Sequence, residues 1–160
     1  MDSRKRQQGF SLIELLIVVA IILIIAAIAI PNLMKSRMAA NESSTVGSLR
    51  TINTGEVTYF SSCPDTGFSN TLGELNTGAV CPGGQGIIDE VLATGAKSGY
   101  VFTYAPGAAD AAGLIDTYTI SAVPETIGVT GQRGFYSDQS GVLRYNLDGS
   151  APTNASSALQ

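Results

Sequence analysis

The chain contains no histidine and no tryptophan among its 160 residues, and only two cysteines. Histidine is the commonest general base and a frequent metal ligand, so its absence counts against a hydrolytic or metal-dependent enzyme. Serine and threonine are plentiful, but without histidine they cannot build the usual Ser-His-Asp triad. The composition therefore favours a structural or binding role over catalysis, with no cofactor and no metal site.

The two cysteines, Cys63 and Cys81, stand 18 positions apart. Structural zinc takes four Cys or His ligands, so two thiols without histidine make a poor metal site. If this region lies outside the cytoplasm, a disulfide between Cys63 and Cys81 is the natural interpretation, and two separate reduced thiols are the alternative. Closing a loop of this size would stabilise the fold by about 3 kcal/mol in the chain-entropy model.

Positive charge is scarce outside the N-terminus. Residues 1–9 contain Arg4, Lys5 and Arg6 against one acidic side chain, and the remainder contains six basic and twelve acidic side chains. Binding to nucleic-acid phosphates needs clustered Lys and Arg. The acidic body, with its net charge of −6, therefore argues against nucleic acid as a direct partner.

An apolar run of 21 residues, from Phe10 to Ile30, follows the basic cluster. As a helix this run would span about 32 Å, enough to cross a hydrocarbon core of about 30 Å. Lys and Arg stay on the cytoplasmic side of a membrane helix, so the chain after Ile30 should lie outside the cytoplasm. An ordinary secretory signal is the alternative, because Ala26, Ala27 and Ala29 could supply a small-residue cleavage site.

One carboxylate, Glu14, interrupts this apolar run, and no basic residue lies between Phe10 and Ile30. A carboxylate in a membrane helix costs about 2.5–3.5 kcal/mol on insertion scales, which a simple anchor has no reason to carry. Cleavage between Gly9 and Phe10 would create an α-amino group that could pair with Glu14 of the same helix or of a staggered neighbour. The second arrangement would set an axial register and favour assembly.

The segment Gly9-Phe-Ser-Leu-Ile-Glu-Leu15 resembles the class III signal of type IV pilins and type II secretion pseudopilins. The resemblance covers about the first third of the chain. It implies that a prepilin peptidase cuts after Gly9 and N-methylates Phe10, and that Glu14 is the assembly residue. Pro31 falls where pilins usually have a proline.

One position departs from the family pattern. Many type IV pilins carry a glycine where this chain has Leu23, and that glycine helps the helix unwind in a fibre. Pro31 is then the only strong helix breaker in the segment. We expect any unwinding or kink to centre just before Pro31.

Apolar residues continue at roughly helical spacing from Pro31 to Phe60. We expect one long helix from about Phe10 to Phe60, whose part within 31–63 is amphipathic. Two helices joined by a loop at Pro31 are the alternative. The helix should end near Cys63, because a residue that precedes proline disfavours the α conformation.

Residues 64–149 are expected to form a globular head, and Ser150–Gln160 a mobile tail rich in Ser, Ala, Pro and Thr. The head begins with an irregular loop in 64–86 and a short helix in 87–93. Strand-like runs follow at 100–104, 116–123, 134–137 and 142–145. They predict an antiparallel meander of three to four strands packed on the long helix, which is an α+β, pilin-like fold.

Three weaker motifs occur in the second half of the helix, in the head and in the tail. Asp138, Asn146 and Asp148 could be calcium ligands, but no full ligand series is present and turn chemistry explains them more simply. Asn41-Glu-Ser43 and Asn154-Ala-Ser156 match the glycosylation sequon, a weak signal.

The resemblance thus implies a structural subunit of a type IV pilus-like filament. The subunit would lie in the bacterial inner membrane before assembly and in a surface pilus afterwards. Its partners would be copies of itself, the prepilin peptidase and the inner-membrane assembly machinery. A pseudopilin of a type II secretion system is the alternative, and an exported binding protein or enzyme is a third hypothesis.

Overall fold

A computed structural model describes residues 10–77 and 86–159. The chain divides into two compact units, Met1–Ser36 and Arg37–Gln160. A single helix, α1 (Leu12–Ser62), continues through Pro31 without interruption. One long helix was expected and is confirmed, and the alternative of two helices with a loop at Pro31 is wrong.

Proline ends α1 close to the predicted place. The last helical hydrogen bond runs from the Cys63 N–H to the Tyr59 carbonyl at 2.9 Å, and Pro64 follows. The chain then reverses at Gly67, whose φ is +79° and whose N–H bonds the Cys63 carbonyl. A Cβ at Gly67 would lie 2.0 Å from the Ile115 carbonyl oxygen, so only glycine fits this turn.

In its described residues, the head contains two short helices and one antiparallel sheet. The helices are α2 (Leu72–Thr77) and α3 (Glu90–Ala93), the latter capped by the Asp89 side chain. The sheet has the order β1-β2-β3-β4-β5-β6, so every strand pairs with its neighbour in sequence. The strands are β1 (Ala96–Lys97), β2 (Tyr100–Pro106), β3 (Tyr118–Pro124), β4 (Gly134–Asp138), β5 (Arg144–Asn146) and β6 (Ser157–Ala158). The predicted α+β meander is confirmed, with two short strands added at its edges.

The C-terminal segment corrects one expectation. Residues 150–160 were expected to form a mobile tail, but β6 lies within them and pairs with β5, Ser157 opposite Tyr145. The Leu159 N–H also donates to the Leu143 carbonyl at 2.7 Å. Leu159 packs against the core and Pro152 is buried, so apolar contacts hold this segment on the sheet despite its polar composition.

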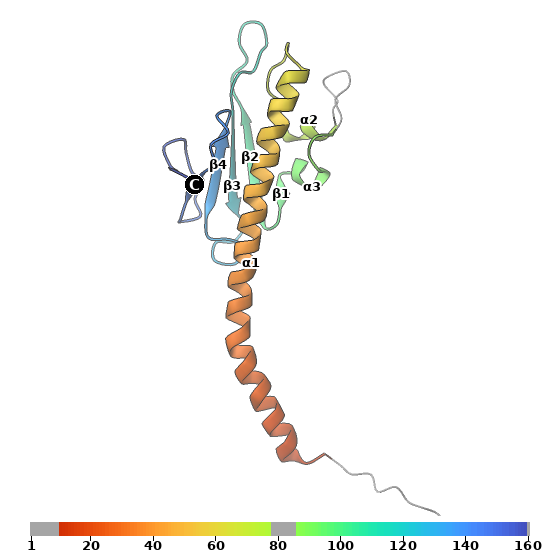
Figure 1. The fold of residues 1–160 in the computed structure, drawn as a ribbon, viewed down its shortest axis with the longest axis vertical. Helices are drawn as coiled ribbons and strands as arrows, with labels where there is room; N and C mark the ends of the chain where they lie inside the picture. The colour runs from red at the N-terminus through yellow and green to blue at the C-terminus, as the bar shows by residue number, and fades with distance from the viewer. Residues whose placement is uncertain (1–9, 78–85, 160) are drawn as a thin grey trace, which may run out of the picture. The chain divides into compact units, whose positions relative to one another are not determined.

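The second half of α1 lies against one face of the sheet (Figure 1). Leu49, Ile52 and Tyr59 lie on the buried face of the helix, where they recur at the spacing of an amphipathic helix. Leu75 of α2 and Leu92 of α3 complete that side of the core. The sheet contributes Tyr100, Phe102, Tyr118, Ile120, Ala122 and Phe135.

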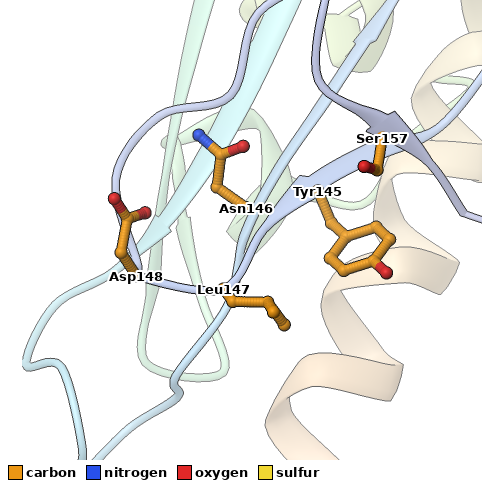
Figure 2. Close-up of a pocket in the computed structure, with 5 residues that line it drawn as sticks. All are labelled: Tyr145, Asn146, Leu147, Asp148 and Ser157. Atoms are coloured by element: carbon orange, nitrogen blue, oxygen red, sulfur yellow. The ribbon is translucent and has the colours of Figure 1, made fainter.

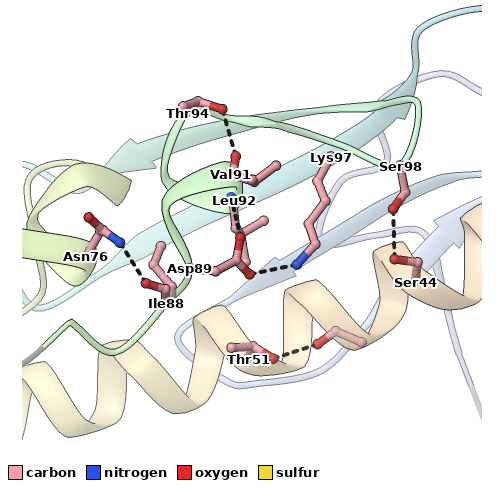
Figure 3. Close-up of polar contacts among 11 residues, drawn as sticks. Ser44, Thr51, Asn76, Ile88, Asp89, Val91, Leu92, Thr94, Lys97 and Ser98 are labelled. Carbon is pink, nitrogen blue, oxygen red and sulfur yellow. Dashed lines mark hydrogen bonds and ion pairs between the residues drawn. The ribbon is translucent and has the colours of Figure 1, made fainter.

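Polar contacts also join α1 to the head. The Tyr118 hydroxyl donates to Asn53 Oδ1 at 3.0 Å, and Asn53 Nδ2 donates to Ser137 Oγ at 2.8 Å. Ser44 of α1 and Ser98 in the β1–β2 turn share a hydrogen bond of 2.9 Å, as Figure 3 shows. The two bonds of Asn53 satisfy part-buried polar groups, whereas the Ser44–Ser98 bond lies at the surface.

Glu56 lies fully buried under the sheet, and it forms no ion pair with any residue that the structure describes. Ser69 donates to its carboxyl group twice, through the hydroxyl at 2.6 Å and the backbone N–H at 3.0 Å. Desolvation raises the pKa of Glu56 and the nearby Glu74 adds to the rise, whereas the bonds from Ser69 and Tyr104 only partly oppose it. The folded head therefore raises the pKa of Glu56 above its ordinary value of 4.5.

This pKa predicts how stability depends on pH. Folded Glu56 keeps its proton while the unfolded side chain has lost it, so its stabilising effect is present at low pH and is lost as pH rises from 4.5 through the folded pKa. Glu56→Gln cannot titrate, so the free energy of unfolding should fall less with pH in this variant than in the wild type. Urea unfolding of the full chain in detergent, between about pH 4 and pH 8, measures both slopes.

The exposed Glu90 supplies the matched control. Glu90→Gln should keep the wild-type slope, because Glu90 lies on the surface of α3. Equal slopes in the wild type and Glu56→Gln would contradict the assignment to Glu56.

Gly47 supplies a second prediction, because a Cβ at this position of α1 would meet no atom within 4 Å. Alanine is favoured over glycine in a helix, so Gly47→Ala should raise the free energy of unfolding by about 0.5–1 kcal/mol. At Gly55, by contrast, a Cβ would lie 3.3 Å from the Ile87 side chain. Gly55→Ala should therefore gain less, and the urea midpoints of the two variants make the comparison.

Candidate assembly segment

The first unit is formed by the apolar part of α1. Within the described residues, α1 is the one helix long and apolar enough to cross a membrane, and none of its most apolar window is buried in the chain. Phe10 is 82% exposed and Leu23 is 63% exposed. A helix that is apolar on all sides needs an apolar environment from outside its own chain, either lipid or other protein.

Glu14 lies in the first turn of this helix and partly caps it. Its Oε2 accepts the Ser11 backbone N–H at 2.9 Å, and the Ser11 carbonyl accepts the Glu14 N–H at 3.1 Å. A carboxylate here bonds an N–H that has no helical partner and lies at the positive end of the helix dipole. The carboxylate thus turns back toward Ser11, the residue that follows Phe10.

Pro31 lies inside α1, and its ring nitrogen cannot donate to the carbonyl one turn earlier, that of Ala27. The neighbouring turn adds a side-chain bond, from Ser36 Oγ to the Asn32 carbonyl at 3.0 Å. A missing backbone bond at a proline is the usual starting point for a helix bend. The kink at Pro31 stays a prediction.

Two other predicted sites fall partly or wholly outside the described residues. Gly9, the predicted cleavage residue, precedes them. Cys63 is buried at the end of α1, with 5% of its surface exposed, but Cys81 lies in 78–85. The pairing of Cys63 with Cys81 therefore stays a prediction.

Two of the weaker candidate ligands in the head take part in local turns. Asp138 Oδ1 accepts the Ser140 N–H at 2.9 Å and also its hydroxyl. Asp148 Oδ1 accepts the Ser150 N–H at 3.0 Å. The pKa of Asp148 is lowered, first by the hydrogen bond from the Ser150 hydroxyl and then by this backbone bond. Side-chain bonds of this kind are typical of Asx turns.

Figure 2 shows the surface hollow beside the second turn, with a volume of about 430 Å³. It is lined by Tyr145, Asn146, Leu147, Asp148 and Ser157. Asn146 Nδ2 is bonded to Ser150 Oγ at 3.2 Å. No group of three or more His, Cys, Asp or Glu side chains within 10–77 and 86–159 could hold a metal ion.

The two sequons differ in their surroundings. Asn41 Nδ2 donates to the Thr130 carbonyl at 2.8 Å, so the amide that would carry a sugar already holds α1 to the β3–β4 loop. Asn154 is exposed.

An ion pair between α1 and the head could not be inferred from sequence. Glu42 Oε2 accepts from Arg133 Nε at 2.8 Å, and Glu42 Oε1 accepts the backbone N–H groups of Gln132 and Arg133. Burial alone would raise the pKa of Glu42, but the hydrogen bonds from Gln132 and Arg133 and the charge of Arg133 lower it. The two residues stand 91 positions apart, and no local pattern connects them.

Comparison with known proteins finds matches for the N-terminal segment. Residues 4–30 match the family model described as the prokaryotic N-terminal methylation motif. The chain is 48% identical over 56 residues to the type IV major pilin protein PilA of Myxococcus xanthus, an alignment covering 35% of this chain and 26% of that protein. It is 56% identical over 39 residues to the type IV wide pilus major component PilA4 of Thermus thermophilus, covering 24% of this chain and 30% of that protein.

The chain therefore spans less than a third of the length of the curated relatives it matches. The predicted resemblance to type IV pilins is confirmed over this segment. No solved structure matches the chain significantly.

Proposed function

We propose that this chain, whose N-terminal segment is that of a type IV pilin, is the structural subunit of a type IV pilus-like filament and not an enzyme. The observation that carries the proposal is the match over residues 4–30, with Glu14 as the lone carboxylate of the apolar run. Both relatives are named as major pilus components, which favours the major subunit and a pilus over a secretion pseudopilus.

The apolar surface of α1 serves two stages in this proposal. Before assembly it spans the inner membrane, with Arg4, Lys5 and Arg6 on the cytoplasmic side and the head outside. In the filament the same surface packs against copies of itself. The exposure of this surface along α1 supports both stages, because no described part of the chain covers it.

Processing gives Glu14 its partner. Cleavage after Gly9 converts the Phe10 amide nitrogen to an amine, which stays positively charged when methylated. Glu14 already bonds the next N–H along the chain, that of Ser11, at 2.9 Å. The Phe10 amine of the same chain or of an incoming copy can therefore pair with Glu14, and an ion pair is strong where water is excluded.

Mass spectrometry of the mature N-terminus tests the processing step. We expect a chain that begins at Phe10 with one added methyl group on its amine. A chain that begins at Met1, or near Asn32 after an ordinary signal, would rule out the pilin assignment.

Glu14→Ala tests assembly separately from processing. The variant should insert in the membrane and be cut after Gly9 as the wild type is, because neither step needs the Glu14 carboxylate in this proposal. It should yield far fewer sheared fibres, since the Phe10 amine, once buried in the filament, would have no counter-charge. Immunoblots of membrane and sheared fractions measure both quantities.

Glu90→Ala removes one carboxylate from the exposed surface of the head and serves as the control. It should assemble normally. Fibres formed by Glu14→Ala in wild-type amounts would remove Glu14 from the assembly step.

A further inference from the structure

Arg50 lies on the exposed face of α1. Its side chain, like those of Lys35 and Arg37, makes no hydrogen bond or ion pair with any described residue, whereas Arg133 is paired with Glu42. Two surface hollows adjoin it. One, of about 330 Å³, is called here the Arg50 hollow and is lined by Arg50, Glu42, Ser43, Val46, Gly47, Arg133 and Leu159. The other, of about 280 Å³, is lined by Arg50, Thr51, Thr54 and Ile87.

Gly47 leaves the floor of the Arg50 hollow open. This residue is exposed in the middle of a helix, and a Cβ there would touch nothing in its own chain. Glycine weakens a helix, so folding of one copy gives no reason for it at this position. Its missing side chain leaves room for another backbone to approach α1 beside Arg50.

The opposite charge gathers where α1 ends. Three exposed carboxylates, Asp65, Asp110 and Asp116, are called here the acidic end. Backbone bonds between Thr66 and Ile115, at 3.0 Å, and between Phe68 and Ile115, at 2.8 Å, bring their two segments together.

Within residues 10–77 and 86–159, none of these three carboxylates forms an ion pair. The sequence has no Lys or Arg at 51–96 or 98–132. The last turn of α1 carries no basic side chain either, so the negative end of its dipole adds to the field.

We propose that the acidic end of one copy docks in the Arg50 hollow of a second copy, with Arg50 paired to Asp65 or Asp116. This contact rests on the proposed polymerisation of the chain. Arginine suits it, because the planar guanidinium binds a carboxylate with two parallel hydrogen bonds. The Arg50 hollow leaves the backbone open at Gly47, and the acidic end supplies a carboxylate as the counter-charge for Arg50.

The two surfaces of one copy cannot meet each other. Arg50 lies 12 residues before the end of α1 at Ser62, which corresponds to a helical rise of about 18 Å, and Asp65 lies beyond that end. The contact is therefore between copies and joins two different surfaces. Contacts of that kind build an open chain of subunits, staggered here by at least about 18 Å along α1, unless the rotation happens to close a ring.

Charge exchange tests the pairing. R50E should lower the yield of sheared fibres several-fold, because it places two like charges in contact. The variants D65K and D116K, each combined with R50E, should restore part of that yield. Asp110 is left unchanged, since it holds its own loop through bonds to the Ala112 and Leu114 N–H groups at 2.8 and 2.9 Å.

E125K is the matched control, with the same change of charge at an exposed position of the β3–β4 loop. It should leave the fibre yield of the wild type unchanged and should not restore that of R50E. Restoration by E125K as well would show a general effect of net charge and would overturn the specific pairing.

A zero-length cross-link identifies the partner directly. In fibres of R50K, carbodiimide should join the introduced lysine to Asp65 or Asp116, and the separation within one copy makes such a bond intermolecular. Peptide mass spectrometry reads the pair. Cross-links from the introduced lysine only to other carboxylates, or only to another protein, would overturn the proposal.

G47L separates docking from folding. The new side chain has space in its own copy, so the melting temperature of the chain should not fall, whereas the fibre yield should fall several-fold because the Arg50 hollow is filled. If G47L and R50E each give the wild-type fibre yield, while Glu14→Ala tested separately still blocks fibres, the proposed contact is wrong and the proposed function is unaffected. Fibres that do not depend on Glu14 would instead count against the proposed function.

Discussion

One helix has to meet two different environments, and the rest of the structure depends on how its side chains divide between them. In the first unit the apolar side chains of α1 are exposed in the described chain. From Glu42 onward one face of the helix is buried by the head, and half of that face is polar: Glu42, Thr45, Ser48 and Glu56, beside Leu49, Ile52, Gly55 and Tyr59. In the proposed membrane stage, a helix apolar along its whole length would carry its second half into the bilayer as well, so this polar face favours a boundary near Ile30.

The two buried carboxylates of α1 are satisfied in different ways. Glu42 meets a guanidinium and two backbone N–H groups, and its pKa is lowered although burial acts in the other direction. Glu56 meets hydroxyl groups and one backbone N–H, and burial dominates, so its pKa is raised. Their contributions to stability therefore change with pH in opposite directions. Near one end of their contact, the Glu42–Arg133 ion pair holds the head to α1. Near the other end, hydrogen bonds to Glu56 hold it, in surroundings that favour the protonated carboxyl group.

The sequence predicts well the elements that have a local signal. The apolar run and helical spacing give the length of α1, and alternating residues near Tyr100 and Tyr118 give the central strands. It does not predict β1 and β6, because a two-residue strand has no periodicity, nor the burial of Pro152, because the surrounding composition is polar. Glu42 and Arg133 could not be paired, since only the folded sheet brings them together. The residues of the candidate site were found from the N-terminal motif, where spacing along one helix already defines the geometry.

The polar bonds between α1 and the head have a mechanical consequence. They are spread along the helix. Asn41 and Glu42 bond the β3–β4 loop, Asn53 bonds strand β4, and Glu56 bonds the segment after α1. A pull along the axis of α1 would load these bonds side by side, in shear, together with the apolar face between them. Bonds loaded in parallel share the force, whereas bonds peeled one after another each bear all of it. A head attached in this way resists having its helix drawn out when tension passes along α1.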